Sequence, residues 1–377
     1  MNGIIFNGNM NSNLIPDFHI FCAGTEITTY AWLASKCLLE SCPLKYRNNV
    51  NIYVHIVGQK KREKEQSHDI LRDIENITVI EDLIRIDERK TPFDCFRIDI
   101  GGGKIRKFAQ RVGNRYSLLR PVSRFIAGPD SRGSLGFYHH EWIHRVCENT
   151  HSDKPIMFLD PDMFIADAGL FSESLLTLDP KSYIRGWIWR NNNSLTYHGN
   201  TYYPMGTELF LINPKLHSAL DIQSENMDTS VLPVIKEAYP DAEIENEQFV
   251  DTIFQSCWYA AIQGYQLDNN FSTLKACHPG GVGHIKLEYL NNMPSEEKNK
   301  IEWIKLNIAR IRLHCRVIEL VERLGKGDTF SPRFLERIFQ FRDFIVKDSQ
   351  LAEIWNIPEP LIAGEENMAH VEKLFSS

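Results

Sequence analysis

Two aspartates interrupt an apolar stretch near the middle of the chain. In "PIMFLDPDMFIADAG", residues 155–169, Asp160 and Asp162 flank Pro161 and have apolar residues on both sides. A carboxylate that leaves water costs several kcal/mol unless it is paired or bound to a metal. Alternate residues of a strand project from one face, about 6.6 Å apart, so the two acids can converge on one ion. Carboxylate oxygens suit Mg²⁺ or Mn²⁺, which retain positions for water and substrate phosphates.

The acid pair therefore predicts a divalent-metal site that clamps a diphosphate. Asp-x-Asp triplets also occur as turns and helix caps, so the alternative is an exposed turn at a strand end with both acids in water. The apolar residues on either side favour a core strand over residues 155–165, where a solvated acid pair would be out of place.

The elements around this stretch alternate between strand and helix. Such alternation is typical of an α/β fold with mostly parallel strands, whose ligands bind beyond the carboxyl ends of the strands. Residues 93–135 are irregular and basic. The apolar patterns predict strands over 17–24, 49–58, 77–83 and 208–213, and helices over 26–42, 61–76, 135–149 and 246–263.

A strand that ends in Asp-x-Asp, preceded by a helix carrying His139 and His140, resembles the GT-A fold of nucleotide-sugar glycosyltransferases. The resemblance covers roughly residues 17–290. It implies a Rossmann-like, mixed and mostly parallel sheet flanked by helices. It also implies that Asp160 and Asp162 hold the divalent ion and touch the sugar nucleotide, with a UDP-sugar as the expected donor.

A second motif fits the same resemblance. "CHPGGVGHIK", residues 277–286, is a glycine-containing loop past the sheet, where GT-A enzymes often supply a histidine ligand to the metal. His278 is the first candidate ligand and His284 the second. Lys286 can neutralise diphosphate charge, although His284 occupies the lysine place of the related pattern His-x-x-Gly-x-x-Lys. The alternative is a glycine turn with two surface histidines.

Acidic residues further along are candidates for the chemical step. Glu247 and Asp251 are four residues apart on one helical face, and either can act as the general base of an inverting transferase. Acids favoured by the helix dipole are the alternative, and a retaining enzyme needs no such base. Glu208, which follows "MGT", is a further candidate for hydrogen-bonding a sugar.

Contacts to the nucleotide and the sugars are predicted from two loops. The loop after the first strand contains Ala23, Gly24 and Thr25, and the resemblance places base and ribose there, although a single glycine also ends strands for structural reasons. His140 is expected near the donor, and a capped or core histidine is the alternative. The segment from Trp187 to Gly206 is rich in Trp, Tyr, Asn and His, which suit sugar faces and hydroxyls, or else form a partly buried aromatic loop.

Basic residues in the irregular segment give weaker signals. Arg115, Arg120 and Arg124 either neutralise phosphate or form a solvated basic face. "IGGGK", residues 100–104, lacks the spacing of a phosphate-binding loop, and we reject that interpretation.

Composition limits the class of protein. The 377 residues are 43% hydrophobic and 24% charged, as in ordinary globular proteins, and the net charge of -7 argues against a nucleic-acid surface. No export signal or membrane span is evident. The eight cysteines form neither a disulfide framework nor a C-x-x-C zinc pair, so we expect free thiols and a cytoplasmic location.

The chain divides into two predicted units. Residues 1–294 form the GT-A-like catalytic domain, with a nucleotide-sugar half at about 17–165 and an acceptor half at about 166–294. Residues 295–377 form a helical extension with long amphipathic helices over 296–324 and 331–355. These helices either cover the catalytic domain, dock a partner or lie on the inner face of a membrane as a peripheral contact.

The leading prediction is a metal-dependent glycosyltransferase that moves a sugar from a nucleotide donor to a hydroxyl acceptor, in glycan or polysaccharide assembly. The alternatives are nucleotidyl transfer by the same aspartate pair and a glycan-binding or scaffold protein without turnover. Phosphatase chemistry of the Asp-x-Asp-x-Thr kind fits poorly, because Phe164 stands in the threonine place.

Overall fold

The core of the protein is a seven-stranded sheet with the order β11-β6-β9-β4-β1-β2-β3. The computed structural model describes residues 15–22, 25–57, 59, 61–81, 83, 139, 142–150, 154–188, 193–220, 231–245, 253–280 and 297–376. The seven strands are β1 (Asp17–Cys22), β2 (Ile52–Ile56), β3 (Ile77–Glu81), β4 (Ile156–Leu159), β6 (Ser182–Ile188), β9 (Met205–Ile212) and β11 (Gln266–Asp268).

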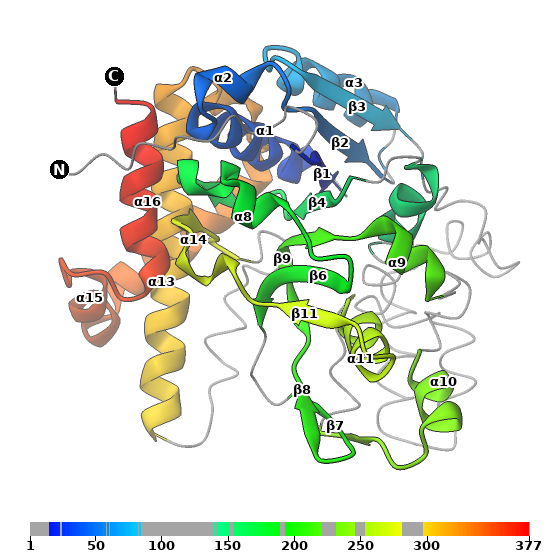
Figure 1. Cartoon of the computed structure of the whole chain (residues 1–377). Coiled ribbons are helices and arrows are strands. Elements are labelled where there is room, and N and C mark those ends of the chain that lie inside the picture. The colour runs from blue at the N-terminus through cyan, green and yellow to red at the C-terminus, as the bar shows by residue number, and fades with distance from the viewer. Residues whose placement is uncertain are drawn as a thin grey trace, which may run out of the picture.

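Most neighbouring strands of this sheet run parallel. β1 pairs parallel with β2 and β4, β2 with β3, and β11 with β6, whereas β9 is antiparallel to both β4 and β6. The predicted fold class, a mixed and mostly parallel sheet flanked by helices with further helices at the C-terminal end, is confirmed (Figure 1).

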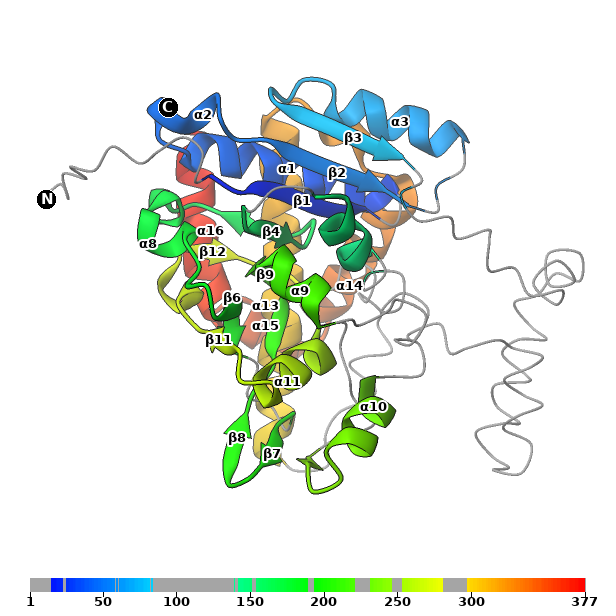
Figure 2. The same ribbon diagram turned by 45° about the vertical axis from the view of Figure 1, so that its right-hand side comes forward.

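Helices cover both faces of the sheet (Figure 2). Side chains alternate along each strand, so Phe18, Ile20 and Cys22 of β1 enter one buried cluster, while Ile156 and Phe158 of β4 enter the other. The first cluster packs under α1 and the C-terminal helices, and the second under the helical residues 142–149 and α11. The helices of the sheet domain are α1 (Thr25–Ser41), α2 (Leu44–Arg47), α3 (Lys61–Leu71), α8 (Glu173–Leu176), α9 (Pro214–Ala219), α10 (Val231–Ala238) and α11 (Phe254–Ile262).

Two smaller sheets lie beside the large one. β10 (Glu243–Ile244), β7 (Leu195–Tyr197) and β8 (Asn200–Tyr202) form a three-stranded sheet, and β5 (Phe164–Ile165) pairs with β12 (Ala276–Cys277). Short 3₁₀ helices occur at η4 (Ala168–Phe171), η6 (Phe271–Thr273) and η8 (Gly327–Thr329). The β7–β8 hairpin turns through two residues with positive φ, His198 at 49° and Gly199 at 76°, as a type I′ turn requires.

Local sequence signals end the helices where expected. α1 stops at Ser41, two residues before Pro43. α11 ends in a glycine cap, because Gly264 takes a φ of 88° and the N–H groups of Gly264 and Tyr265 bond back to the carbonyls of Ala261 and Ala260. The expected single helix over 331–355 is divided in two, because the Asp348 carboxylate accepts hydrogen bonds from the N–H groups that begin the second helix.

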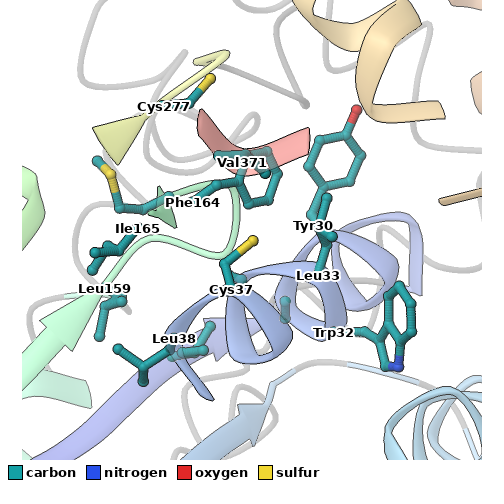
Figure 3. Close-up of a cluster of buried hydrophobic side chains, with 14 of the residues drawn as sticks. Tyr30, Trp32, Leu33, Cys37, Leu38, Leu159, Phe164, Ile165, Cys277 and Val371 are labelled. Carbon is teal, nitrogen blue, oxygen red and sulfur yellow. The ribbon is translucent and has the colours of Figure 1, made fainter. Parts of the chain in front are cut away.

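The C-terminal helices share the buried core of α1. They are α13 (Glu297–Arg323), α14 (Pro332–Lys347), α15 (Ser349–Trp355) and α16 (Ala363–Leu374). Tyr30 of α1 packs its ring against Phe164, Phe330 and Phe334, with ring centroids 5.8–6.0 Å apart. Figure 3 shows Tyr30 and Cys37 on one side of α1, facing Phe164, Cys277 and Val371 of α16. Among the described residues, no helix is both long and apolar enough to cross a membrane.

Two buried histidines occupy the opposite face of the sheet. His19 and His55 lie on adjacent strands with Nδ1 of His19 2.9 Å from Nε2 of His55, and the His19 ring stacks on Tyr53 at 4.8 Å. One imidazole donates and the other accepts, so the pair is held neutral. Burial lowers the pKa of His19 to about 3, and burial together with the neighbouring His19 places the pKa of His55 well below its usual value.

Stability is therefore expected to fall in mild acid. Each histidine takes up a proton in the unfolded chain near pH 6.5 but not in the folded one, so the stability it contributes is complete above that pH and is lost as the pH falls below it, toward about pH 3 for His19. For His19 alone the free energy of unfolding should drop by roughly 2 kcal/mol between about pH 6.5 and pH 5. Urea unfolding across this range measures the drop.

The His19→Phe variant provides the comparison, because phenylalanine keeps a ring against Tyr53 and takes up no proton. It should be less stable than the wild type at pH 7.5, since His55 loses its hydrogen-bond partner, yet show a shallower acid slope. Equal slopes in the two proteins would contradict the assignment.

Candidate functional site

The two aspartates lie in a turn between two strands, not within one continuous strand. β4 ends at Leu159 and β5 begins at Phe164, so the predicted single core strand over 155–165 is interrupted by a turn at residues 160–163. The Asp160 N–H donates to the carbonyl of Glu208 at 2.9 Å, and the Met163 N–H donates to the carbonyl of Asp160 at 3.1 Å. Pro161 holds the second position of this β-turn, where its fixed φ is favoured and its missing N–H costs no strand pairing.

Pairing of two very short strands completes the cluster. Phe164 of β5 pairs with Cys277 of β12, and His278 follows directly on that strand. Nε2 of His278 lies 3.2 Å from Oδ1 of Asp162 and 3.8 Å from Oδ2 of Asp160. One ligand atom from each of these three residues fits within 4.8 Å of the others, a spacing that can hold a metal ion.

The three side chains differ in exposure. Asp162 is buried, with 7% of its side chain exposed, whereas Asp160 and His278 retain 25% and 28%. Asp162 is therefore enclosed by protein, while Asp160 and His278 keep part of their surface accessible to a ligand. Neither the buried carboxylate nor the geometry fits the alternative of two acids in a fully solvated turn.

Charge controls the protonation of the cluster. Burial acts to raise the pKa of Asp162, but the facing His278 outweighs it and the pKa of Asp162 is lowered. Burial acts to lower the pKa of His278, but the charges of Asp162, Asp160 and Glu208 raise it to about 9. The negative charge of the two aspartates thus favours a positive charge beside them, which a protonated His278 or a bound cation can supply.

A second layer of residues reaches the cluster from the C-terminal helices. His314 of α13 is fully buried, and its Nδ1 lies 2.7 Å from the hydroxyl of Tyr30. Burial lowers the pKa of His314 to about 4, with Asp162 and the carbonyl of Gly280 acting in the opposite direction. Neutral His314 carries one ring proton, so its Nδ1 either accepts a hydrogen bond from the Tyr30 hydroxyl or donates one to it, depending on the tautomer.

Glu208 lies beside the metal cluster on β9. The pairing of Leu159 with Leu209 places Glu208 opposite Asp160. A side chain at Gly206, two residues earlier on the same face, would overlap the Glu208 carboxylate. The absence of a side chain at Gly206 therefore allows the Glu208 carboxylate to occupy its position without a steric clash. Of the residues proposed from sequence for sugar contacts, Glu208 is the one placed next to the aspartates.

The aromatic segment from Trp187 to Gly206 spreads over several elements. The Trp187 indole N–H donates to the carbonyl of Phe271 at 2.7 Å, and the Tyr197 ring packs edge-on against Tyr239 at 5.4 Å. These rings have structural partners, as the alternative interpretation of a partly buried aromatic loop expects. Tyr203 is 36% exposed and remains available to a sugar face.

Several predicted site residues fall outside the described residues: Ala23, Gly24, His140, Glu247, Asp251, His284, Lys286, Arg115, Arg120 and Arg124. Thr25 is the first residue of α1, three positions after Cys22 at the end of β1. His139 stacks on Trp142 with ring centroids 5.1 Å apart, and Trp142 in turn packs in the buried cluster below the sheet.

His314 and Tyr30 were not predicted from the sequence. A histidine in an amphipathic helix and a tyrosine in an apolar one carry no local signal, and their positions are 284 residues apart. Only the packing of α13 across α1 brings them to the metal cluster.

Comparisons with known proteins give matches at the level of structure. No protein-family model matches the chain, and no curated protein gives a significant match. The galactosyltransferase LgtC in complex with donor and acceptor sugar analogs is 13% identical over 67% of this chain and 72% of that chain, with a TM-score of 0.36. Mouse xyloside xylosyltransferase 1 is 12% identical over 67% and 84%, with a TM-score of 0.36.

The bifunctional glycosyltransferase WbbM is 9% identical over 70% of this chain and 40% of that chain, with a TM-score of 0.33. These solved structures are glycosyltransferases by name. Identities of 9–13% and TM-scores of 0.33–0.36 assign this chain no family, substrate or activity.

Proposed function

We propose that the protein is a divalent-metal-dependent glycosyltransferase that moves a sugar from a nucleotide-sugar donor to a hydroxyl acceptor. The observation that carries the proposal is the convergence of Asp160, Asp162 and His278 beyond the carboxyl end of β4. Mostly parallel sheets place their ligands at that edge, and β4 lies where the sheet changes from parallel to antiparallel pairing.

The donor set fits a small hard cation. Two carboxylate oxygens and one imidazole nitrogen suit Mn²⁺ or Mg²⁺ and leave positions open for water and phosphate oxygens. Mn²⁺ is our first choice because of the imidazole ligand. When bound, the ion supplies positive charge to the departing nucleoside diphosphate.

The chain's own residues orient this site. The turn hydrogen bonds fix the backbone of Asp160, and the buried position of Asp162 fixes its carboxylate toward the loop of His278. During transfer the anomeric carbon forms a bond to the acceptor oxygen and loses its bond to the β-phosphate oxygen, which keeps the electron pair. The acceptor proton passes to a base; Asp251 or Glu247 would serve in an inverting enzyme.

Glu208 is proposed to hold a hydroxyl group of the donor sugar. Its carboxylate is half-buried beside the cluster and close enough to raise the pKa of His278. A carboxylate with free lone pairs in a half-open site is a strong acceptor for sugar hydroxyls.

Enlarging Gly206 tests the placement of Glu208. Gly206→Ala should change the free energy of unfolding by less than about 1 kcal/mol, because the obstacle is the mobile end of a side chain. Donor hydrolysis should nevertheless fall by about 10- to 100-fold, since the carboxylate is pushed out of position. Glu208→Gln should show a similar loss. Wild-type rates in both variants would remove Glu208 from the site.

A UDP-sugar is the proposed donor, and a hydroxyl of a glycan or polysaccharide is the proposed acceptor. We place the protein in the cytoplasm, in line with the free cysteines among the described residues, with peripheral membrane contact as one use of the C-terminal helices. These assignments rest on the resemblance noted from the sequence and on the cluster chemistry.

A donor screen tests the proposal. Purified protein is incubated with UDP-, GDP-, CMP- and dTDP-sugars, with Mn²⁺ or with a chelator, and both the thermal midpoint and nucleotide release are measured. One donor should raise the midpoint and be slowly hydrolysed only with Mn²⁺. Release of pyrophosphate from a nucleoside triphosphate would indicate nucleotidyl transfer instead. Sugar binding that ignores metal, with no turnover, would indicate a glycan-binding protein.

A further inference from the structure

Helix α13 passes directly over the loop that carries His278. Gly280, two residues after His278, has a φ of 75°, and a Cβ at this position would lie 3.5 Å from Nε and 3.6 Å from Nη2 of Arg310. Cζ of Arg310 is at 3.7 Å, so the guanidinium packs flat over the glycine. Arg310 is half-buried, which places a permanent positive charge beside Gly280, two residues after His278.

Arg310 and His314 occupy the same face of α13. They are four residues apart, and both lie beside the loop: a Cβ at Gly280 would meet the Arg310 guanidinium, and the carbonyl of Gly280 acts to raise the pKa of His314. Two neighbouring arginines of the helix form ion pairs with α16. Arg312 pairs with Glu365 at 2.7 Å, and Arg316 pairs with Glu372 at 2.7 Å, which ties α13 to α16.

The proposed reaction develops negative charge that a further cation can balance. The charges of Asp160 and Asp162 cancel those of a divalent ion, and Glu208 adds a further negative charge nearby. The diphosphate brings about two negative charges before transfer and about three after it. His278 is neutral when it binds a metal. The ion, the two aspartates and His278 together therefore do not balance the negative charge that develops on the diphosphate.

We propose that Arg310 binds the diphosphate of the nucleotide-sugar and stabilises it as the leaving group. This inference rests on the proposed glycosyltransfer function. As the bond from the anomeric carbon to the β-phosphate oxygen breaks, its electron pair stays on that oxygen, and the guanidinium N–H groups of Arg310 donate to the phosphate. A planar guanidinium can contact two phosphate oxygens at once, which an ammonium cannot match.

The test compares ligands that differ in the second phosphate. Wild type, Arg310→Ala and Arg310→Lys are titrated with UDP, UMP, GDP and GMP in saturating Mn²⁺, and separately with Mn²⁺ alone. Arg323→Ala is the matched control, because Arg323 is an exposed arginine in the last turn of the same helix. Thermal unfolding of each variant verifies folding.

Arg310→Ala should lower the affinity for the nucleoside diphosphate that the wild type binds by about 10- to 100-fold. The affinity for the corresponding monophosphate should fall by less than about threefold. Mn²⁺ affinity should stay within about twofold, and Arg310→Lys should recover part of the loss. Equal loss for mono- and diphosphate, or no loss for either, would overturn the role of Arg310. A wild type that binds no nucleoside diphosphate with Mn²⁺ would overturn the proposed function itself.

Discussion

Replacing Asp162 by asparagine is expected to weaken Mn²⁺ binding by more than about 100-fold. Loss of a residue that only supports a metal ligand already costs up to about 100-fold in affinity, and Asp162 is itself a proposed ligand. Asparagine has nearly the same shape, so the turn and its hydrogen bonds can persist. The amide offers no negative charge, and the buried position of Asp162 means that water cannot take over its role. Calorimetric titration of Mn²⁺ into the nucleotide-free protein measures the effect.

A matched control distinguishes a specific site from general negative charge. Asp343 is an exposed acid on α14 that pairs with Arg342 at the surface. Asp343→Asn should bind Mn²⁺ as the wild type does and unfold within about 0.5 kcal/mol of it. Equal Mn²⁺ affinity in the wild type and in Asp162→Asn would show that the Asp160, Asp162 and His278 cluster holds no ion.

Replacing Phe334 by alanine is expected to lower the free energy of unfolding by about 3–5 kcal/mol. Phe334 is fully buried on α14, and its ring packs at 5.8 Å from Tyr30 and at 5.5 Å from Phe330. The ring centroids of Phe334 and His314 are 6.5 Å apart. The cavity that Phe334→Ala creates therefore adjoins His314, in the second layer of the metal cluster. Urea unfolding followed by fluorescence and by circular dichroism measures the loss.

Phe344→Ala is the control for this prediction, because Phe344 lies on the same helix but is 46% exposed. It should change the free energy of unfolding by less than about 1 kcal/mol. If the C-terminal helices share one core with α1, Phe334→Ala should shift a single transition for both probes. Two separated transitions, with only one of them shifted, would show that the helices unfold as an independent unit.

Much of the fold was predictable because its strands are short apolar runs bounded by turn residues. The pattern of 17–24 gave β1, and the stop at Pro43 gave the end of α1. The antiparallel direction of β9 was not predictable, because alternation of apolar residues records which face is buried and not which way a strand runs. β5 and β12 are two residues long each, and such pairs have no pattern to detect.

The candidate site was predictable in its residue types but not in its assembly. Asp160 and Asp162 stood out because acids are rare within apolar runs. Their partner His278 is 116 residues away from Asp162, and only the pairing of β5 with β12 brings it to them. The positions of Arg310 and His314 beside this loop depend on how α13 crosses Gly280, which no local pattern in the helix encodes.

The most direct test is the anomalous diffraction of a crystal grown with Mn²⁺ and UDP. The account predicts one anomalous peak, from a manganese ion next to Asp160, Asp162 and Nε2 of His278. It also predicts that the UDP diphosphate lies between this ion and Arg310. Manganese elsewhere, or a diphosphate bound away from the turn between β4 and β5, would contradict the assignment of this cluster as the catalytic centre.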